Sequence, residues 1–246
     1  MTPLNTKTAF VTGGSRGIGA AIVKRLVQDG AAVAFTYVSS ASRAEALAAE
    51  LTQQGGHVLA IQADSADAAA LTAAIRQAAA AFGHLDILVN SAGIANNKAV
   101  EDHTLAEFRQ MMAVHVEAPF VATQAVLPYM AAGGRIITIG SNFAERVPAA
   151  NTTLYATSKA ALLGFTKGLA RDLGPLRITV NLIQPGPIDT DMNPADGPSS
   201  DWIRNQMAIP EFGQGADIAS LVAWVAGPES RFMTGAILTI DGGMNT

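Results

Sequence analysis

The segment TGGSRGIG, residues 12–19, lies between a short apolar run and a stretch with the spacing of an amphipathic helix. Its glycines, Gly13, Gly17 and Gly19, follow the order GxxxGxG rather than the GxGxxG of the commonest dinucleotide-binding loop. Glycine permits positive φ and close approach of a ligand to the backbone, and a helix N-terminus attracts anionic groups. The segment is therefore either a tight strand-to-helix turn or a loop that binds a pyrophosphate.

Apolar runs and helical segments alternate along the rest of the chain, which places the glycine-rich loop in an α/β pattern. Predicted strands cover residues 8–12, 32–37, 58–62, 85–89, 135–140, 177–183 and 236–240. Predicted helices cover residues 18–28, 42–53, 67–82, 105–130, 154–173 and 217–225. The third helix is capped by Asp67 or Ser65, and the fourth is broken near its start. This order demands right-handed crossovers, so we predict a three-layer α/β fold with helices on both faces of a mainly parallel sheet.

The composition indicates a large buried core and excludes several classes of protein. Of the 246 residues, 49% are hydrophobic and 15% are charged, and no repeat or low-complexity linker divides the chain. We therefore predict a single domain over residues 1–246. A net charge of −4 offers no broad basic surface to nucleic acid or to an anionic membrane. The absence of cysteine rules out disulfides, a thiolate nucleophile and cysteine-ligated zinc.

No metal site is predicted, because His57, His84, His103 and His115 show no mutual ligand spacing and no HExxH motif occurs. Apolar stretches are interrupted well short of the roughly 20 residues that span a bilayer. We expect a soluble protein that binds neither membranes nor nucleic acid, and the cysteine-free composition fits the cytoplasm.

The end of the second strand bears on the choice between NADPH and NADH. In a parallel sheet the site lies beyond the carboxyl ends of the strands, and an acidic residue after the second strand binds a free ribose 2′-hydroxyl. Tyr37 occupies that position, so no carboxylate repels a 2′-phosphate. Arg16 and Ser39 or Ser40 can bind such a phosphate, which favours NADPH/NADP+; alternatively, Arg16 only caps the loop from solvent.

Two further strand ends carry candidate cofactor contacts. Asp64 and Ser65 follow the third strand, where Asp64 either meets an adenine edge or acts as a turn residue. NSAG follows the fourth strand, and its small residues Ala92 and Gly93 leave room beside a cofactor. We expect Asn90 both to lie beside the cofactor and to hold neighbouring strands by side-chain hydrogen bonds.

The fifth strand and the helix after it carry the candidate catalytic residues. Ser141 ends that strand, and YATSK places Tyr155 and Lys159 four residues apart, on one face of a helix. A lysine ammonium near the Tyr155 hydroxyl is expected to lower the pKa of that hydroxyl. Tyr155 can then exchange a proton with a carbonyl or alcohol oxygen that Ser141 holds. YxxxK alone is a weak signal, but it coincides here with the glycine-rich loop, NSAG and a serine closing the fifth strand.

These motifs, together with PGPIDT at residues 185–190 and DGG at 241–243, cover almost the whole chain. The sequence resembles the classical short-chain dehydrogenase/reductase family, and it is most similar to the 3-oxoacyl-acyl-carrier-protein reductase type. The resemblance implies a Rossmann-type fold with a seven-stranded sheet. It also implies hydride transfer between a nicotinamide and a small-molecule carbonyl or alcohol, catalysed by Ser141, Tyr155 and Lys159, in a homotetramer.

In the family the lysine also binds the nicotinamide ribose, and the segment matching Pro185, Gly186, Ile188 and Thr190 closes over the carboxamide and pyrophosphate. The expected cofactor contacts are Gly13, Ser15, Arg16, Gly17, Ile18, Gly19, Tyr37, Ser39, Ser40, Asp64, Ser65, Asn90, Ala92, Gly93, Tyr155, Lys159, Pro185, Gly186, Ile188 and Thr190.

His115 departs from the family pattern, which has asparagine at this position to hold a water in the proton relay behind the lysine. Imidazole can donate and accept hydrogen bonds, so His115 can replace the asparagine and is included among the catalytic residues. Two other interpretations stay open. The ring can be a neutral histidine packed in the helix, or its bulk and charge near Lys159 can damage the relay.

Residues 189–212 mix Pro, Gly and Asp with Trp202, Ile203 and Met207. They are predicted to form a substrate lid with a short apolar helix, or a helix that simply packs on the body. A second functional hypothesis is a nucleotide-binding regulator with weak or no catalysis. It rests on His115 and on the segment 185–198, which is similar to that of a bacterial biofilm-dispersal mediator described as binding a cyclic dinucleotide.

Overall fold

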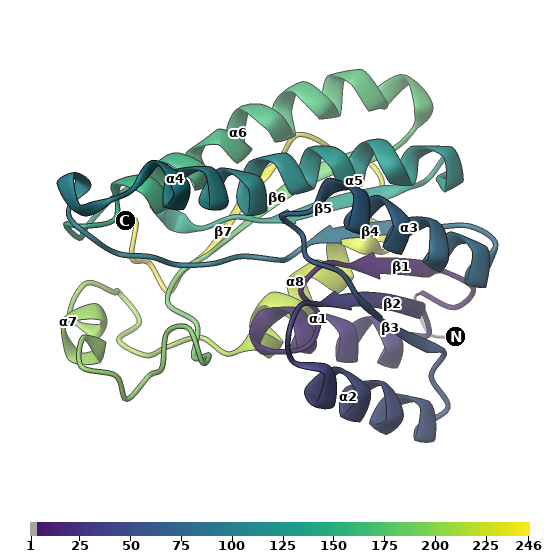
Figure 1. The fold of residues 1–246 in the computed structure, drawn as a ribbon, viewed down its shortest axis with the longest axis horizontal. Helices are drawn as coiled ribbons and strands as arrows, with labels where there is room; N and C mark the ends of the chain where they lie inside the picture. Colours follow the sequence, from purple (N-terminus) through teal and green to yellow (C-terminus); the bar gives the residue numbers. More distant parts are fainter. Residues whose placement is uncertain (1–3) are drawn as a thin grey trace.

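The computed structural model describes residues 4–246, and its centre is a single sheet of seven parallel strands (Figure 1). The strand order is β3-β2-β1-β4-β5-β6-β7. The strands are β1 (Thr8–Val11), β2 (Ala32–Tyr37), β3 (Val58–Gln62), β4 (Ile87–Asn90), β5 (Arg135–Ile139), β6 (Thr179–Pro185) and β7 (Ile237–Ile240). The three-layer α/β prediction is confirmed. The order reverses between β1 and β4, which makes that carboxyl edge the switch point where such sheets bind ligands.

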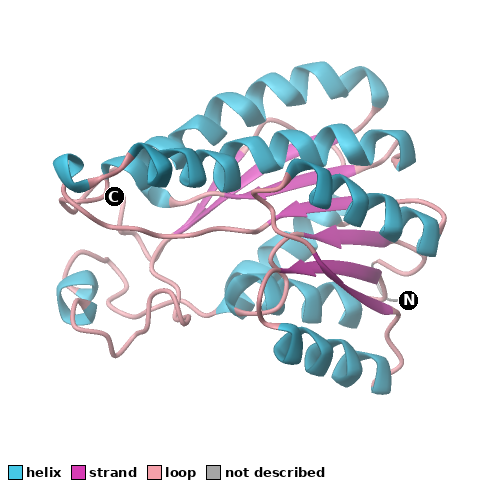
Figure 2. Ribbon diagram, viewed as in Figure 1, coloured by secondary structure: helices cyan, strands magenta, loops and turns pink. Residues whose placement is uncertain are grey.

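Helices cover both faces of the sheet (Figure 2). One face carries α1 (Gly17–Gln28), α2 (Ala41–Gln53) and α8 (Gly215–Ala226); the other carries α3 (Ala68–Phe82), α5 (Ala118–Val126) and α6 (Thr153–Leu173). The inner strands β2, β1, β4, β5 and β6 are mostly buried, as expected when helices exclude water from both sides, whereas the edge strands β3 and β7 are only partly buried. Within residues 4–246, no helix is both long and apolar enough to cross a membrane.

The third helix shows how local sequence sets a helix boundary. The carboxylate of Asp67 accepts hydrogen bonds from the backbone N–H groups of Ala69 and Ala70, at 2.9 and 3.0 Å. Gly83 adopts a left-handed conformation just after the last turn. Asp67 is therefore the N-cap, and Ser65 is not.

The predicted break near the start of helix 105–130 is wrong. A capping box between Thr104 and Glu107 begins a regular helix, α4 (Leu105–Met112). The irregular part comes in the middle, as the π-helical segment η2 (Ala113–Glu117), and α5 follows directly. Pro119 has no N–H to donate to the carbonyl of His115 four residues earlier, which disturbs the α-helical ladder at this point.

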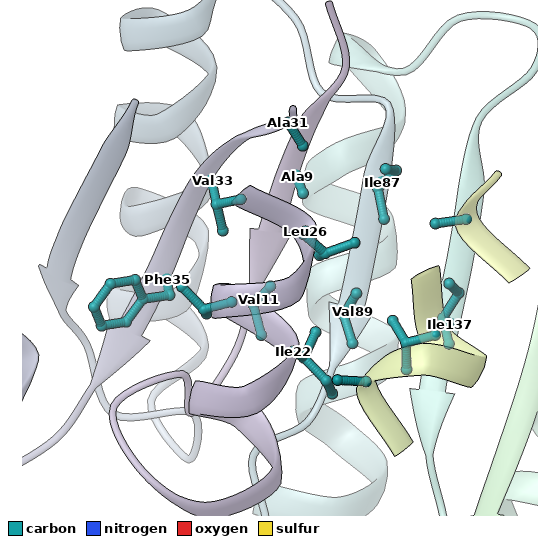
Figure 3. Packing of buried hydrophobic residues seen from close by; sticks show 14 of the residues in the cluster. Ala9, Val11, Ile22, Leu26, Ala31, Val33, Phe35, Ile87, Val89 and Ile137 are labelled. Carbon is teal, nitrogen blue, oxygen red and sulfur yellow. The ribbon is translucent and has the colours of Figure 1, made fainter. Parts of the chain in front are cut away.

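The core beneath the glycine-rich loop is built by α1 and the strands it covers (Figure 3). Ile22 and Leu26 are fully buried and belong to the same cluster as Val11, Val33 and Val89. Burying each large aliphatic side chain contributes roughly 1.5–3 kcal/mol. This packing determines where α1 begins, and so where the loop before it lies.

Candidate active site

Packing space, rather than turn geometry alone, explains the glycines of the loop at residues 12–19. A Cβ on Gly19 would lie 2.2 Å from the carbonyl oxygen of Gly13, and one on Gly13 would lie 2.9 Å from the Cα of Ala92. Gly14, which the sequence analysis did not single out, leaves no room either, because a Cβ there would lie 2.5 Å from the Cβ of Phe35. The loop thus packs closely against the carboxyl ends of β2 and β4.

The N-terminus of α1 faces the same region without a side-chain cap. Arg16 is its N-cap residue, in extended conformation, and its side chain makes no capping hydrogen bond. Gly17 follows with φ of +52°, and Ser15 and Ile18 flank this turn. The first-turn N–H groups of a helix need an external acceptor, so the turn fits an anionic group such as a pyrophosphate.

A surface groove lined by both basic and acidic side chains adjoins this turn. Ser39 and Ser40 lie beyond Tyr37 at the end of β2, and Ser40 is the N-cap residue of α2 without a side-chain cap. Arg43, in the first turn of α2, was missed by the sequence analysis; it lines this groove together with Arg16. Arg43 is the first basic residue after the second strand in the sequence. Only the fold shows that α2 directs its side chain toward the groove that Arg16 lines.

Arg43 is held by the segment after β6. Its Nη1 lies 2.7 Å from Oδ2 of Asp191, and both side chains are more than half exposed, at 60% and 57%. Arg43, with a smaller effect from Arg16, holds the pKa of Asp191 below its usual value. Exposed pairs of this kind contribute little to stability, so the guanidinium is available to a competing anion.

The ends of β3 and β4 show mixed roles for the predicted residues. Oδ1 of Asp64 accepts the N–H of Ala66 at 2.9 Å, so the turn interpretation of Asp64 has direct structural support; Ser65 beside it is buried. Nδ2 of Asn90 donates to Thr138 at 3.3 Å and joins β4 to β5. The Oδ1 atom of Asn90 is buried and, among residues 4–246, has no hydrogen-bond partner.

Thr12, another residue that the sequence analysis missed, connects the two loops of the switch point. Its hydroxyl accepts the N–H groups of Ser91 and Ala92, both at 3.0 Å. Gly93 follows beside the chemical side of the site, where a Cβ would lie 3.4 Å from Nε2 of His115 and 3.9 Å from Nζ of Lys159. The loop after β4 thus joins the glycine-rich loop to the candidate catalytic residues.

The structure brings Ser141, Tyr155 and Lys159 together. Ser141 is buried just after β5, where its hydroxyl accepts the N–H of Phe143 at 3.2 Å, and it lies close enough to Tyr155 to influence the pKa of the Tyr155 hydroxyl. Nζ of Lys159 donates to the carbonyl of Ile139 at 3.1 Å. The same Nζ lies 5.7 Å from the centroid of the Tyr155 ring.

The expected lowering of the Tyr155 pKa by Lys159 is wrong. Burial raises the pKa of Tyr155, and the hydrogen bond from Ser141 opposes this only in part. The ammonium of Lys159 lies over the ring face and is itself buried, and burial lowers its pKa to about 8. Desolvation disfavours the charged forms of both residues.

His115 uses both ring nitrogens in hydrogen bonds within the protein. Nε2 accepts the N–H of Ile94 at 3.0 Å, and Nδ1 lies 2.8 Å from Oγ of Ser158. Because Ser158 donates its own proton to the carbonyl of Tyr155 at 2.7 Å, Nδ1 is the donor and the ring is neutral. Burial, with a contribution from Lys159, lowers the pKa of His115 to about 2. This geometry favours the neutral, packed histidine over a side chain that holds a relay water.

The segment after β6 runs from the sheet toward the glycine-rich loop. Pro185 ends β6, and Gly186 lies against residue 241, since a Cβ on Gly186 would lie 2.5 Å from the Cα of Asp241. Ile188 is buried and forms an isolated parallel bridge. The Cγ2 of Thr190 would lie 3.5 Å from a Cβ on Gly17. The four predicted residues therefore link the end of β6 to the start of α1.

Residues 189–212 extend beyond the carboxyl edge of the sheet and carry the short helix α7 (Ser200–Arg204), drawn apart from the two helical layers in Figure 1. The guanidinium of Arg204 donates to the carbonyl of Ala195 at 2.6 Å and lies over the ring of Phe212. Trp202 is 43% exposed. Both interpretations of the segment, as a substrate lid and as a helix that packs on the body, stay predictions.

Known proteins resemble the whole chain. The family model described as enoyl-(acyl carrier protein) reductase matches residues 13–245. The cyclic-di-GMP-binding biofilm dispersal mediator protein of Escherichia coli K12 is 47% identical, over 96% of this chain and 96% of its own length.

Two solved structures superpose with a TM-score of 0.98 each, over 99% of this chain and 100% of theirs. One is a short-chain dehydrogenase/reductase from Serratia marcescens, 57% identical, and the other a short-chain dehydrogenase from Burkholderia cenocepacia in complex with NADP, 55% identical. With the sheet order and the arrangement of the predicted residues, these matches show that the chain belongs to the short-chain dehydrogenase/reductase family of oxidoreductases.

Proposed function

We propose that the protein is an NADPH-dependent reductase that converts a carbonyl group of a small molecule to a secondary alcohol, reversibly. The observation that carries the proposal is the meeting of Ser141, Tyr155 and Lys159 at the carboxyl edge, beside an uncapped helix N-terminus. A hydroxyl pair and a buried lysine next to a loop suited to a pyrophosphate are what carbonyl reduction with a dinucleotide requires.

The residues present fit NADPH. The glycines of residues 12–19 keep the α1 N-terminus free of side chains, which suits the pyrophosphate. Arg16 and Arg43, with Ser39 and Ser40, would hold the 2′-phosphate, and no carboxylate ends β2. The solved relative from Burkholderia cenocepacia, in complex with NADP, supports the same cofactor here. When bound, NADPH supplies the hydride to the carbonyl carbon.

The protein's own residues would manage the oxygen and its proton. Ser141 donates a hydrogen bond to the carbonyl oxygen, and the hydroxyl of Tyr155 gives its proton to that oxygen as the alcohol forms. The raised pKa keeps Tyr155 protonated at neutral pH, as a proton donor must be. The resulting tyrosinate lies next to the Lys159 ammonium, which favours the charged form until solvent returns a proton. In the reverse direction Tyr155 accepts the proton of the alcohol.

Oxidation of NADPH by a panel of β-ketoesters, diketones and aryl ketones tests the proposal. We expect consumption of NADPH in equal amount to the alcohol formed, and slower turnover with NADH. The half-exposed Trp202, with Met192 and Ile209, favours substrates that carry an apolar part. Absence of oxidation across all three substrate classes would contradict the proposal. We also infer a homotetramer in the cytoplasm, which sedimentation equilibrium and cell fractionation would check.

A second candidate function, a cyclic-dinucleotide-binding regulator, is favoured by one observation: the Escherichia coli relative at 47% identity is named as a cyclic-di-GMP-binding protein. Calorimetry with NADPH and with cyclic di-GMP separates the two candidates. Micromolar or tighter binding of cyclic di-GMP, with no turnover of NADPH, would support the regulator in place of the reductase.

A further inference from the structure

Residues 241–246, here called the terminal segment, touch three walls of the candidate site. Asp241 lies against Gly186 in the segment after β6. The carbonyl of Gly242 accepts the N–H of Ile209, at the end of the lid, at 2.9 Å. The carbonyl of Met244 accepts a hydrogen bond from Arg146, in the loop that follows Ser141. The terminal segment therefore connects the cofactor side, the lid and the catalytic loop.

Asn142, directly after Ser141, is the centre of these contacts. Its side chain is buried, and its Nδ2 lies 3.3 Å from Oδ1 of Asn245 and 3.5 Å from Oδ2 of Asp241. In return, Nδ2 of Asn245 donates to the carbonyl of Asn142 at 2.9 Å. The other end of the Asn142 amide, Oδ1, lies 3.5 Å from the hydroxyl of Ser141.

The terminal segment is itself folded around one carboxylate. Oδ1 of Asp241 accepts the N–H of Gly243 at 2.9 Å, and Oδ2 accepts the N–H of Asn245 at 3.0 Å. This turn aims the Asn245 side chain at Asn142. Reciprocal amide hydrogen bonds between two partly or fully buried side chains define one orientation of each amide.

We propose that Asn142 and Asn245 are positioning residues, which hold the loop that carries Ser141 in place beside Tyr155 and couple its position to the lid. Without Asn245, the Nδ2 of Asn142 loses its nearer acceptor and the carbonyl of Asn142 loses its donor. The loop at residues 141–146 then becomes more mobile at Ser141, the residue that must bind the carbonyl oxygen. The proposal rests on the reductase function proposed above.

The test compares Asn245→Ala with Thr246→Ala, because the side chain of Thr246 is exposed and bonds only to Gly243 within the segment. We expect Asn245→Ala to lower kcat about tenfold with little change in the KM for NADPH, and Thr246→Ala to change neither. Asn245→Gln, which keeps the amide on a longer arm, should retain more kcat than the alanine variant. In the background of Asn142→Ala, the Asn245→Ala change should have almost no further effect on kcat.

The pH profile separates positioning from a general loss of structure. Because the Ser141 hydrogen bond lowers the pKa of Tyr155, a misplaced Ser141 should move the high-pH limb of kcat for reduction to higher pH. An unchanged limb, equal losses for Asn245→Ala and Thr246→Ala, or additive effects of the two asparagine substitutions would overturn the proposal.

Hydrogen exchange tests the same contacts without any turnover. Asn245→Ala should speed the exchange of residues 141–146 and of Ile209, while Thr246→Ala should leave it unchanged; equal exchange in both variants would overturn the proposal. If the unsubstituted protein does not oxidise NADPH, the reductase function fails, and the exchange experiment still decides whether the terminal segment holds the loop.

Discussion

The nucleotide side of the sheet edge surrounds residues 12–19. Here the glycines are needed because a Cβ would clash with neighbouring atoms, and the charged side chains of Arg43 and Asp191 are exposed. Around Tyr155, the chemical side of the same edge, Lys159, His115 and Ser141 are buried. Desolvation raises the pKa of Tyr155 and lowers those of Lys159 and His115, whereas the exposed Asp191 is shifted mainly by Arg43. We expect substitutions on the nucleotide side to change cofactor affinity and those on the chemical side to change kcat.

The largest effect is expected from Tyr155→Phe, which removes the hydroxyl that we propose as the proton donor and keeps the ring. General acid catalysis is worth about 10²- to 10⁴-fold, so kcat for ketone reduction should fall by that range. The Kd for NADPH, measured by fluorescence titration, should change less than about threefold, because the ring still fills its place. If the affinity for NADPH fell as much as kcat, the expectation that chemical-side substitutions change kcat and not cofactor affinity would be wrong.

Next in size is Gly19→Ala, whose Cβ would lie 2.2 Å from the carbonyl oxygen of Gly13. Overpacking should lower the free energy of unfolding by about 1–3 kcal/mol. The displaced loop should also weaken NADPH binding about tenfold or more, with kcat at saturating NADPH nearly unchanged. Urea unfolding and NADPH titration measure the two effects.

Gly164→Ala is the matched control, since a Cβ on this helical glycine meets nothing within 4 Å. It should stabilise α6 by about 0.5–1 kcal/mol without changing cofactor affinity. Equal NADPH affinities of the two glycine variants would show that packing space does not define the nucleotide side.

His115→Asn should lower stability more than it changes catalysis. Asparagine cannot reach both Ile94 and Ser158, so one buried group loses its partner, at a cost of about 1–3 kcal/mol. We expect kcat to change less than about threefold. Urea unfolding and steady-state kinetics at pH 7 measure this, with His84→Asn, at an exposed histidine, as control. A loss of kcat of tenfold or more would show that the reaction itself needs the imidazole.

The pH dependence of the free energy of unfolding gives a second test of His115. The folded-state pKa of His115 is lowered from 6.5 to about 2, so between these values the unfolded chain binds a proton that the folded chain does not. The stabilising contribution of the neutral ring is present above pH 6.5 and is lost progressively as the pH falls below it. His115→Asn should remove this part of the acid destabilisation.

The smallest loss of stability is expected from Arg43→Ala. Loss of a charge-assisted contact to the 2′-phosphate should lower kcat/KM for NADPH about tenfold, or about 1.4 kcal/mol, and leave kcat/KM for NADH unchanged. Stability should change by less than about 1 kcal/mol, because the pair with Asp191 is exposed. Arg76→Ala, at an exposed arginine of α3, is the control. Equal losses with both cofactors would remove Arg43 from the 2′-phosphate site.

The sequence predicted the strands and most helices because each follows a local period or cap, as Asp67 shows at the start of α3. It did not predict Arg43, because the direction of a side chain on α2 depends on how that helix packs. The pKa of Tyr155 was expected in the wrong direction because burial depends on the tertiary structure. The sequence did not predict the π-helical turn at His115, because the residues around it favour a regular helix. The turn depends on one lost hydrogen bond, which Pro119 cannot donate to the carbonyl of His115.

The most direct test of the central claim, that Tyr155 and its neighbours catalyse hydride transfer from NADPH, is to follow the transferred hydrogen. NADPH that carries deuterium in both positions at C4 of the nicotinamide is incubated with a ketone that the protein reduces, and the alcohol is examined by mass spectrometry and NMR. We expect deuterium on the carbinol carbon with the unsubstituted protein and about 10²-fold or more slower labelling with Tyr155→Phe. Labelling by Tyr155→Phe at the unsubstituted rate, or alcohol formed without deuterium at that carbon, would contradict it.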